Sequence, residues 1–310
     1  MPYASFPRAN MSQPPQRPSP GWLPAGACGP ATVLCMLWLV ARLATQAAPA
    51  AEPPPATVVD FDVSRPQETL HVRLLDPPEA TRAAQPWLLL TFSTDRQTSL
   101  TREPYCGPGY QFLRAGHRVA SFDLPAHGDR IDARGKGIDG LRERFLANDD
   151  PFVRFCGDGS AVIDELIRRN FAVEGRIAVV GVSRAGYCAT RLLAADRRIA
   201  GGAALAPVTD WRVLSEFAEV RTRDDVARLA LEQFAPALVG RPLYMAMGNR
   251  DQRVGTDALL RFGASLCVAE EQARVERSRL KLLVVDDSPG HSLQDRWRDA
   301  GGEFLLQLAR

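Results

Sequence analysis

The chain has 310 residues, and 45% of them are hydrophobic, which is enough for one or two domains with a large buried core. Its 38 basic and 36 acidic side chains leave a formal net charge of +2, so no strong positive field favours nucleic acid as a partner. Like charges occur only in short runs, and no internal repeat is evident.

The first fifty residues differ in composition from the rest of the chain. Residues 1–30 are rich in proline and small residues and contain two arginines, and a short apolar run follows at residues 31–40. This order, closed by the small-residue triplet at 48–50, is typical of a secretory signal. We therefore predict a signal peptide over residues 1–50 and an exported protein, periplasmic or secreted. The alternative is an uncleaved membrane tether through residues 31–43, although the apolar run is shorter than the roughly 20 residues that span a bilayer.

A proline-rich linker at residues 51–56 precedes a predicted domain over residues 57–310. The first segments of this domain alternate polar and apolar residues, as half-exposed antiparallel edge strands do, and they span residues 56–63 and 68–75. Residues 86–92 form a nearly continuous apolar run, which predicts a central strand of the sheet.

Strands and helices alternate over the remainder of the chain. Apolar runs predict further strands at residues 116–124, 177–180, 199–206, 241–248 and 280–285. Apolar spacing and composition predict helices at residues 107–115, 155–170, 185–195, 257–279 and 293–308. This alternation predicts an α/β fold, in which helices cover both faces of a mostly parallel sheet.

Two segments do not follow the simple alternation. Residues 129–150 are charged and contain glycine without a clear period, which indicates a surface excursion that could form part of the rim over a site. Residues 208–239 hold two helical patterns, around residues 211–220 and 224–234, and these could form a small helical cap.

Ser183 stands at the bend between a predicted strand and a predicted helix. This is the context of a G-x-S-x-G nucleophile elbow, in which a tight turn lifts the serine hydroxyl clear of the sheet. The turn also places the backbone N–H of Arg184 at a helix start, where unpaired amides and the helix dipole favour a developing oxyanion. The alternative is a serine that only caps the helix.

The segment around Ser183 resembles the alpha/beta-hydrolase superfamily, and its Gly-x-Ser-Arg pattern is similar to the prolyl-oligopeptidase and dienelactone-hydrolase-like branch. Ala185 stands where that family has its second glycine, and Gly186 follows one residue later. The resemblance implies an alpha/beta-hydrolase fold. It also implies a triad in the chain order serine, acid, histidine.

That order can be tested on the sequence. Among the four histidines, at positions 71, 117, 127 and 291, only His291 lies downstream of Ser183. Asp251 follows a predicted strand in a segment that looks like the family's Gly-x-x-Asp-x-x-Val acid loop, and its competitors are Asp257, Asp286 and Asp287. We predict that the catalytic residues are Ser183, Asp251 and His291.

The other site assignments rest on position in the resembled family. The loop after the strand at 86–92 would supply a second oxyanion N–H from Ser93 or Thr94, beside that of Arg184. The Arg184 side chain could meet a substrate carboxylate, but pairing with an acid in a neighbouring loop is favoured. For His127 a structural role in a turn is favoured. The mechanism that the resemblance implies requires neither a metal nor an organic cofactor.

Four cysteines lie outside the predicted signal. In an exported protein a disulfide is plausible, and Cys106 with Cys156 is the pair we expect. Cys188 and Cys267 are interpreted as small buried hydrophobic residues on helices.

We expect an exported serine hydrolase that cleaves carboxylic esters of small molecules through an acyl-enzyme. One alternative is a serine peptidase or aminoacyl hydrolase of the prolyl-oligopeptidase type. A second is a hydrolase-fold protein that binds a ligand or partner without turnover, since fold alone does not dictate function. A third is a metal-dependent deacetylase.

Overall fold

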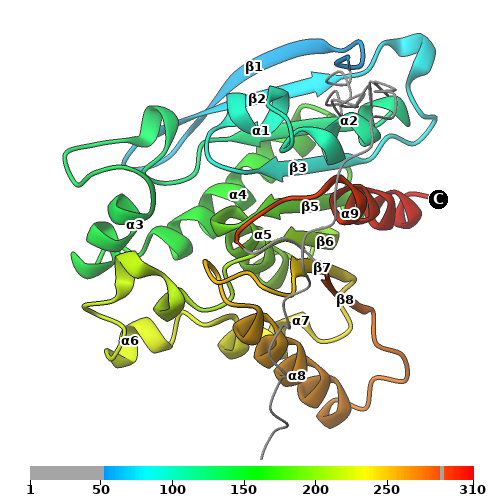
Figure 1. Cartoon of the computed structure of the whole chain (residues 1–310). Coiled ribbons are helices and arrows are strands. Elements are labelled where there is room, and N and C mark those ends of the chain that lie inside the picture. The colour runs from blue at the N-terminus through cyan, green and yellow to red at the C-terminus, as the bar shows by residue number, and fades with distance from the viewer. Residues whose placement is uncertain (1–51, 287–289) are drawn as a thin grey trace, which may run out of the picture. The chain divides into compact units, whose positions relative to one another are not determined.

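The computed structural model describes residues 52–286 and 290–310 (Figure 1). The signal or anchor predicted at residues 1–50 lies outside these described residues. These described residues belong to one compact unit. No helix in the described ranges has both the length and the apolar character that crossing a bilayer requires.

The described residues build one eight-stranded sheet in the order β1-β2-β4-β3-β5-β6-β7-β8. Its strands are β1 (Thr57–Ser64), β2 (Thr69–Asp76), β3 (Leu88–Phe92), β4 (Arg118–Phe122), β5 (Ile177–Val182), β6 (Ile199–Leu205), β7 (Leu243–Gly248) and β8 (Leu280–Val285). β1 pairs antiparallel with β2, and β2 pairs antiparallel with β4, while the other neighbours are parallel. The predicted mostly parallel sheet with an antiparallel edge is confirmed.

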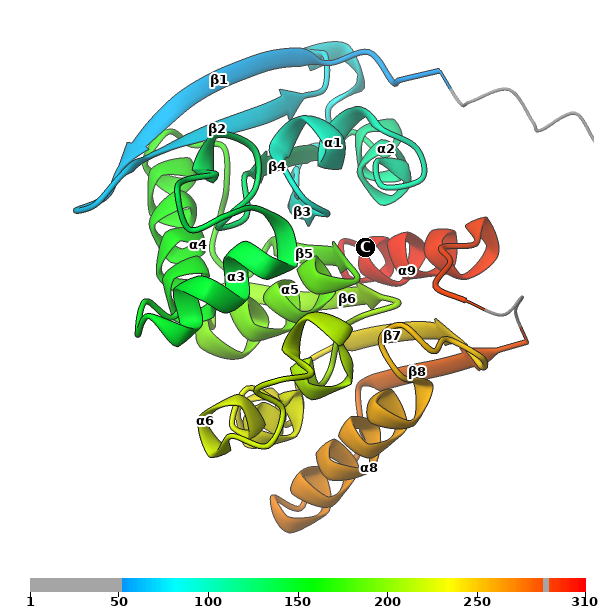
Figure 2. The ribbon, with the colours of Figure 1, turned by 60° about the vertical axis from the view of Figure 1, so that its left-hand side comes forward.

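Helices cover both faces of this sheet (Figure 2). One face carries α1 (Arg96–Thr101), α2 (Gly107–Arg114) and α9 (Asp295–Leu308). The other face carries α4 (Pro151–Arg168), α5 (Arg184–Ala195) and α8 (Thr256–Gln272). The shorter helices are α3 (Gly137–Leu146), α6 (Asp224–Ala227) and α7 (Ala235–Leu238).

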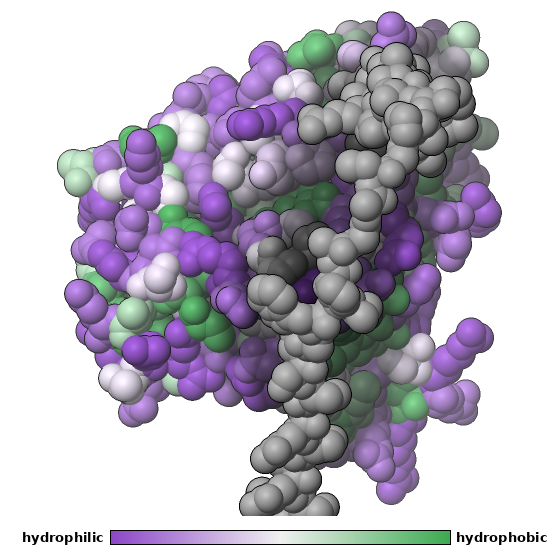
Figure 3. All heavy atoms as spheres, in the orientation of Figure 1, coloured by the Kyte–Doolittle hydropathy of each residue, from purple (hydrophilic) through white to green (hydrophobic). Residues whose placement is uncertain are grey.

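The two faces have separate hydrophobic cores. Leu88 and Leu90 belong to the core under α4, α5 and α8, whereas Leu89 belongs to the core under α2 and α9. Successive side chains of a strand point to opposite faces, so a strand covered on both sides is apolar at nearly every position. Figure 3 shows that hydrophilic residues occupy most of the outer face in view.

The helix predicted at 257–279 ends earlier, at Gln272, because a helix-terminating turn follows it. Arg274 has a left-handed backbone, with φ at 56°. Its N–H donates to the carbonyl of Glu271, and the N–H of Val275 donates to the carbonyl of Glu270. This pair of hydrogen bonds is the Schellman motif, which closes a helix even without glycine at the left-handed position.

The two helices expected within 208–239 are not formed as regular helices. The segment contains the 3₁₀ turns Trp211–Val213, Ser215–Phe217 and Leu231–Phe234, together with the four-residue helices α6 and α7. Trp211, Leu214 and Phe217 are all buried, and their spacing of three residues fits the 3₁₀ period. Trp211 packs against Phe152 of α4 and Tyr187 of α5, which holds the segment against the body of the domain.

Two short helices were not predicted. α1 begins after Asp95, whose carboxylate accepts the N–H of Thr98 and so caps the helix. α3 lies in the segment at 129–150, for which we expected no regular structure. It buries Ile138 and Leu141, which are too few apolar residues to show a period in the sequence.

The disulfide expected between Cys106 and Cys156 is wrong, because both are free thiols. Cys106 lies in the core under α2, whereas Cys156 lies on α4 beyond the opposite face, so the sheet stands between them. Cys188 is buried on α5, as interpreted from the sequence. Cys267 is exposed on α8, which corrects the prediction that it is buried.

Candidate active site

The predicted strand, sharp turn and helix are present around Ser183. β5 ends at Val182 and α5 begins at Arg184. Ser183 has φ 57° and ψ −121°, a conformation that costs a non-glycine residue on the order of 1–3 kcal/mol. The surroundings hold it there, because its N–H donates to the carbonyl of Leu205 at 2.8 Å and its carbonyl accepts the N–H of Gly186 at 2.9 Å.

Small residues allow this turn to be so tight. A Cβ placed on Gly181 would lie 2.1 Å from the carbonyl oxygen of Ala185, so only glycine fits at that position. A Cβ on Gly186 would lie 2.9 Å from Cβ of Pro207. Ala185 itself is fully buried, and its methyl group is accommodated in the core under α5. The close approach of the helix to a neighbouring loop therefore occurs at Gly186, one residue after the family position.

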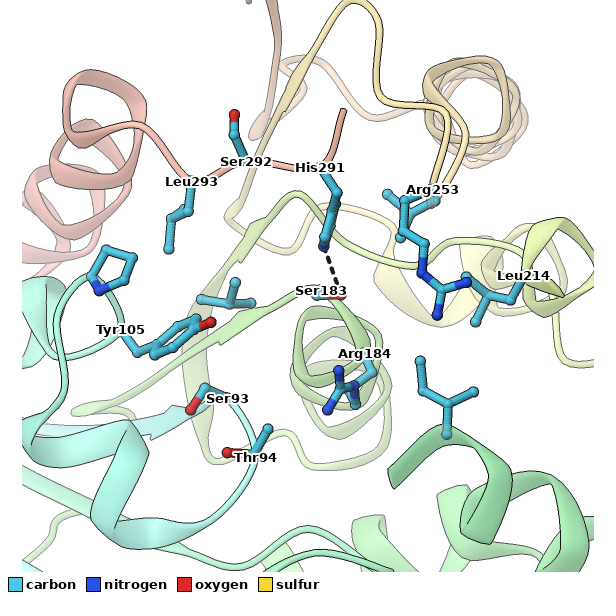
Figure 4. Close-up of a pocket in the computed structure, with 14 residues that line it drawn as sticks. Ser93, Thr94, Tyr105, Ser183, Arg184, Leu214, Arg253, His291, Ser292 and Leu293 are labelled. Atoms are coloured by element: carbon cyan, nitrogen blue, oxygen red, sulfur yellow. Dashed lines mark hydrogen bonds between the residues drawn. The ribbon is translucent and has the colours of Figure 1, made fainter. Parts of the chain in front are cut away.

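The three predicted catalytic side chains lie in hydrogen-bond contact. His291 Nε2 is 3.0 Å from Ser183 Oγ (Figure 4), and His291 Nδ1 is 2.7 Å from Asp251 Oδ2. Because a carboxylate only accepts, Nδ1 carries the proton and donates to Asp251, and Nε2 is left to accept the Ser183 hydroxyl proton. This tautomer is the one that a general base acting on serine requires.

Asp251 is oriented by its own loop. It is 4% exposed, and its Oδ1 accepts the N–H groups of Arg253 at 3.0 Å and Val254 at 3.1 Å. One carboxylate oxygen is thus fixed by the backbone, and the other is aimed at His291.

The competing acids lie elsewhere or outside the described residues. Asp257 pairs with Arg261 one turn along α8, and Asp286 lies 3.6 Å from Arg296. Asp287 is outside the described residues. Of the acids weighed from the sequence, Asp251 is the one that contacts His291.

The alternatives for the second oxyanion donor are not equivalent. The N–H of Ser93 already donates to Ser99 Oγ at 2.9 Å. The N–H of Thr94 has no acceptor within the described part of the chain, and Thr94 and Arg184 both line the cavity at Ser183. The N–H of Arg184 is the first of α5, and a first-turn amide has no acceptor in its own helix. The backbone N–H groups of Thr94 and Arg184 are therefore our candidates for an oxyanion hole, and the N–H of Ser93 is not.

The cavity at Ser183 has a volume of about 220 Å³. Apolar side chains form much of its wall, and these are Pro104, Ile138, Val182, Leu214, Val254 and Leu293. Polar groups reach it from Tyr105, Arg184 and Arg253 (Figure 4). Within residues 52–286 and 290–310, no cluster of three or more histidine, cysteine or acidic residues is arranged to hold a metal ion.

Arg184 has a different partner from the one predicted. Across the described ranges no carboxylate lies within 4.0 Å of its guanidinium, so the expected ion pair is wrong there. Instead, Arg184 Nη1 donates to His127 Nε2 at 3.0 Å, and His127 Nδ1 donates to the carbonyl of Pro125 at 2.9 Å. These two contacts require a neutral imidazole, and burial lowers the pKa of His127 to about 4. His127 thus keeps its turn contact and also supports Arg184.

Two contributors to the cavity wall were not assigned from the sequence. Tyr105 points its hydroxyl into the cavity (Figure 4). Arg253 lies in the acid loop and forms a two-armed ion pair with Glu216, with Nη1 2.8 Å from Oε2. Its place in the Gly-x-x-Asp-x-x-Val segment was the one signal that could have indicated its proximity to the site.

Comparisons with known proteins agree with this architecture. No protein-family model matches the chain. A probable dipeptidyl-aminopeptidase B from Colletotrichum graminicola is 30% identical over 128 residues, which is 39% of this chain and 14% of that protein. Dipeptidyl peptidase 4 from Porphyromonas gingivalis matches with a TM-score of 0.60 at 16% identity, covering 81% of this chain and 35% of that one.

Acetyl xylan esterase 1 from a Thermoanaerobacterium species matches over more of its own length. The TM-score is 0.60 at 15% identity, and the match covers 84% of this chain and 86% of that one. Peptidases and esterases therefore share this arrangement of strands and helices. With the sheet order and the turn at Ser183, these likenesses show that the chain has the alpha/beta-hydrolase fold.

Proposed function

We propose that this protein is a serine hydrolase that cleaves carboxylic esters of small molecules through an acyl-enzyme. The observation that carries the proposal is the continuous chain of contacts from Asp251 through His291 to Ser183, with heavy-atom distances of 2.7 Å and 3.0 Å. A serine hydroxyl is a weak nucleophile at neutral pH, and this arrangement supplies both its base and the group that orients the base.

The first half-reaction forms the acyl-enzyme. Ser183 Oγ attacks the ester carbonyl while His291 Nε2 takes the hydroxyl proton, and Asp251 stabilises the resulting imidazolium. The N–H groups of Arg184 and Thr94 receive the oxyanion, and one such donor lowers the barrier by about 3 kcal/mol. When the intermediate collapses, His291 returns the proton to the alcohol oxygen, which leaves.

The second half-reaction regenerates the enzyme. His291 takes a proton from a water molecule, whose oxygen attacks the acyl carbon, and the bond to Ser183 Oγ then breaks. The proton passes from His291 to Ser183, and the carboxylic acid is released. The same two amide groups serve both tetrahedral intermediates.

A peptidase of the dipeptidyl-aminopeptidase kind is the second candidate, and the local sequence match supports it. An enzyme that acts at the amino end of a peptide must accommodate an ammonium group. Among the described residues that line the cavity, Arg184 and Arg253 are cationic and none is acidic. This charge favours a neutral or anionic substrate, so we place the ester hydrolase first.

Labelling with a fluorophosphonate tests catalysis directly. We expect the wild-type protein to be labelled and Ser183→Ala to lose labelling completely. Ser292→Ala is the matched control, because Ser292 lines the same cavity and should not alter the site of attachment. If correctly folded wild-type protein is neither labelled nor active on nitrophenyl esters of graded chain length, a binding protein without turnover is favoured instead.

We also propose export, on the composition of residues 1–50. The amino-terminal residue of the protein recovered from its native cell distinguishes a cleaved signal from a retained anchor.

A further inference from the structure

Arg184 is a cation in the cavity that forms no ion pair with a described carboxylate, because Glu216, the acid that attracts it, is engaged by Arg253. Its Nη1 is held by a neutral imidazole, its buried Nε has no partner, and its Nη2 makes no hydrogen bond to a described residue. The other arginine of the cavity, Arg253, is paired with Glu216. A charge removed from water without a partner is costly, so an unpaired guanidinium beside a nucleophile indicates that a ligand supplies the partner.

His127, which holds the Arg184 side chain, leaves the positive charge of the guanidinium available to a ligand. His127 is 6% exposed and neutral, so it fixes the guanidinium through one nitrogen without cancelling or adding to its charge. A guanidinium fixed at one nitrogen keeps other N–H groups available for a planar anion such as a carboxylate. The hydroxyl of Tyr105 also points into the cavity and has no hydrogen-bond partner among the described residues, so it provides a further donor.

The position of Arg184 indicates which part of the substrate it meets. In Figure 4, His291 and Arg253 lie on one side of Ser183, and Arg184 lies on the other side with Ser93 and Thr94. His291 must protonate the leaving alcohol, so the alcohol occupies the His291 side. The carbonyl oxygen faces the N–H groups of Arg184 and Thr94 on the opposite side of Ser183, and the acyl chain on the same carbon is thereby placed within reach of the Arg184 side chain. The cavity volume of about 220 Å³ is below that of typical pockets for drug-sized ligands, which restricts this acyl group to a short chain.

We propose that Arg184 binds a free carboxylate on the acyl part of the substrate, so that the preferred esters are half-esters of short dicarboxylic acids. This inference rests on the proposed esterase function. It assigns Arg184 two separate tasks, since its backbone N–H faces the oxyanion and its side chain selects the substrate.

A matched pair of substrates tests this assignment. Monomethyl succinate carries the free carboxylate, whereas dimethyl succinate has the same carbon chain without the charge. Hydrolysis of both esters is followed by titration of the released acid at constant pH. We expect the wild type to have the higher kcat/KM for the monoester. Arg184→Met should lower the ratio of kcat/KM for the monoester to kcat/KM for the diester about ten- to hundredfold, which is the effect of losing a hydrogen bond to a charged group. Arg184→Lys should restore part of the preference, because it keeps the charge but not the planar fork.

The rate of fluorophosphonate labelling distinguishes two roles for the Arg184 side chain, which are binding the substrate carboxylate and holding the turn at His127 in place. If Arg184 only props the turn at His127, Arg184→Met will lower labelling and the hydrolysis of both esters in the same proportion, and the inference is overturned. A wild type that favours the diester overturns it as well. If the wild type is neither labelled nor active on either ester, the proposed function fails, which is a distinct outcome from failure of the Arg184 assignment alone.

Discussion

Asp251 shows how one buried carboxylate can have two separate tasks. Its Oδ1 is held by two backbone N–H groups, and its Oδ2 accepts from His291. The carboxylate therefore cannot turn away, and it fixes both the ring orientation and the tautomer of His291. The function of Asp251 in the proposed mechanism depends on its being an acceptor at both oxygens.

Asp251→Asn removes that property with little change of shape. An amide group offers N–H donors at one end, so either the backbone contacts or the contact with His291 Nδ1–H is lost, and the imidazole is released to the wrong tautomer. We expect kcat for ester hydrolysis to fall roughly 10⁴-fold, with the fold retained by circular dichroism. The matched control is Asp257→Asn, an acid that pairs with Arg261 on α8 and lies outside the cavity. A loss of less than tenfold in Asp251→Asn would exclude the assigned role.

The buried imidazole of His127 makes the free energy of unfolding depend on pH. Its pKa is about 4 in the folded protein, chiefly because of burial, against an ordinary value near 6.5. Between these values the unfolded chain binds a proton that the folded chain does not, so the free energy of unfolding falls as pH is lowered from 6.5 toward 4. At pH 5 the loss from this group is about 2 kcal/mol.

His127→Gln tests this contribution, since an amide can still accept from Arg184 and donate to the carbonyl of Pro125. Urea unfolding at pH 7 and at pH 5 measures the free energies. The wild type should lose about 2 kcal/mol more than the variant between these values. Equal losses in the two proteins would show that His127 does not titrate in this range.

At the scale of elements, the turn between β5 and α5 is closely packed on both sides of Ser183. The Cα of Gly181 lies against the backbone carbonyl of Ala185. Ala185 is fully buried, so this carbonyl cannot move aside. The strained dihedral angles of Ser183 persist only because these neighbours fix the chain before and after it.

Gly181→Ala should therefore destabilise the whole domain. The added Cβ would lie 2.1 Å from a carbonyl oxygen, so the elbow must open, and we expect a loss of about 3 kcal/mol in the free energy of unfolding together with loss of fluorophosphonate labelling. Gly157→Ala in α4 is the control, because its Cβ would meet only the flexible end of Arg65 at 3.3 Å and alanine favours a helix. Equal stability of the two variants would refute the close packing of the turn.

For the whole molecule, the sheet topology assembles the site. Ser183 follows β5, Asp251 follows β7, and His291 lies in the loop after β8. These strands are parallel, so their carboxyl ends meet at one edge of the sheet, and Thr94 after β3 lies at the same edge. Loops at that edge converge on a crevice, which is where open α/β sheets bind ligands.

The sequence alone predicted much of this arrangement. Apolar runs are sufficient to locate buried strands, because a strand covered on both faces is apolar at most positions, and Thr91 and Ser121 are exceptions in β3 and β4. The chain has only four histidines, and His291 is the one that follows Ser183 in the sequence. The Gly-x-x-Asp-x-x-Val segment indicated Asp251. These residues could be proposed from the sequence because the resembled fold fixes their order along the chain, and order is a property of sequence.

Tertiary structure decided which groups touch. The pairing of Arg184 with His127, the occupation of the Ser93 N–H by Ser99, and the separation of Cys106 from Cys156 by the sheet all depend on how distant elements pack. Periodicity records which side of an element is buried, but it does not record which neighbour covers that side. For this protein the sequence by itself determined the strands, the helices α2, α4, α5, α8 and α9, and the chain order of the proposed triad. Only the folded chain decided the other helices and the partners of each side chain, because hydrogen bonds and ion pairs are set by distances across the sheet.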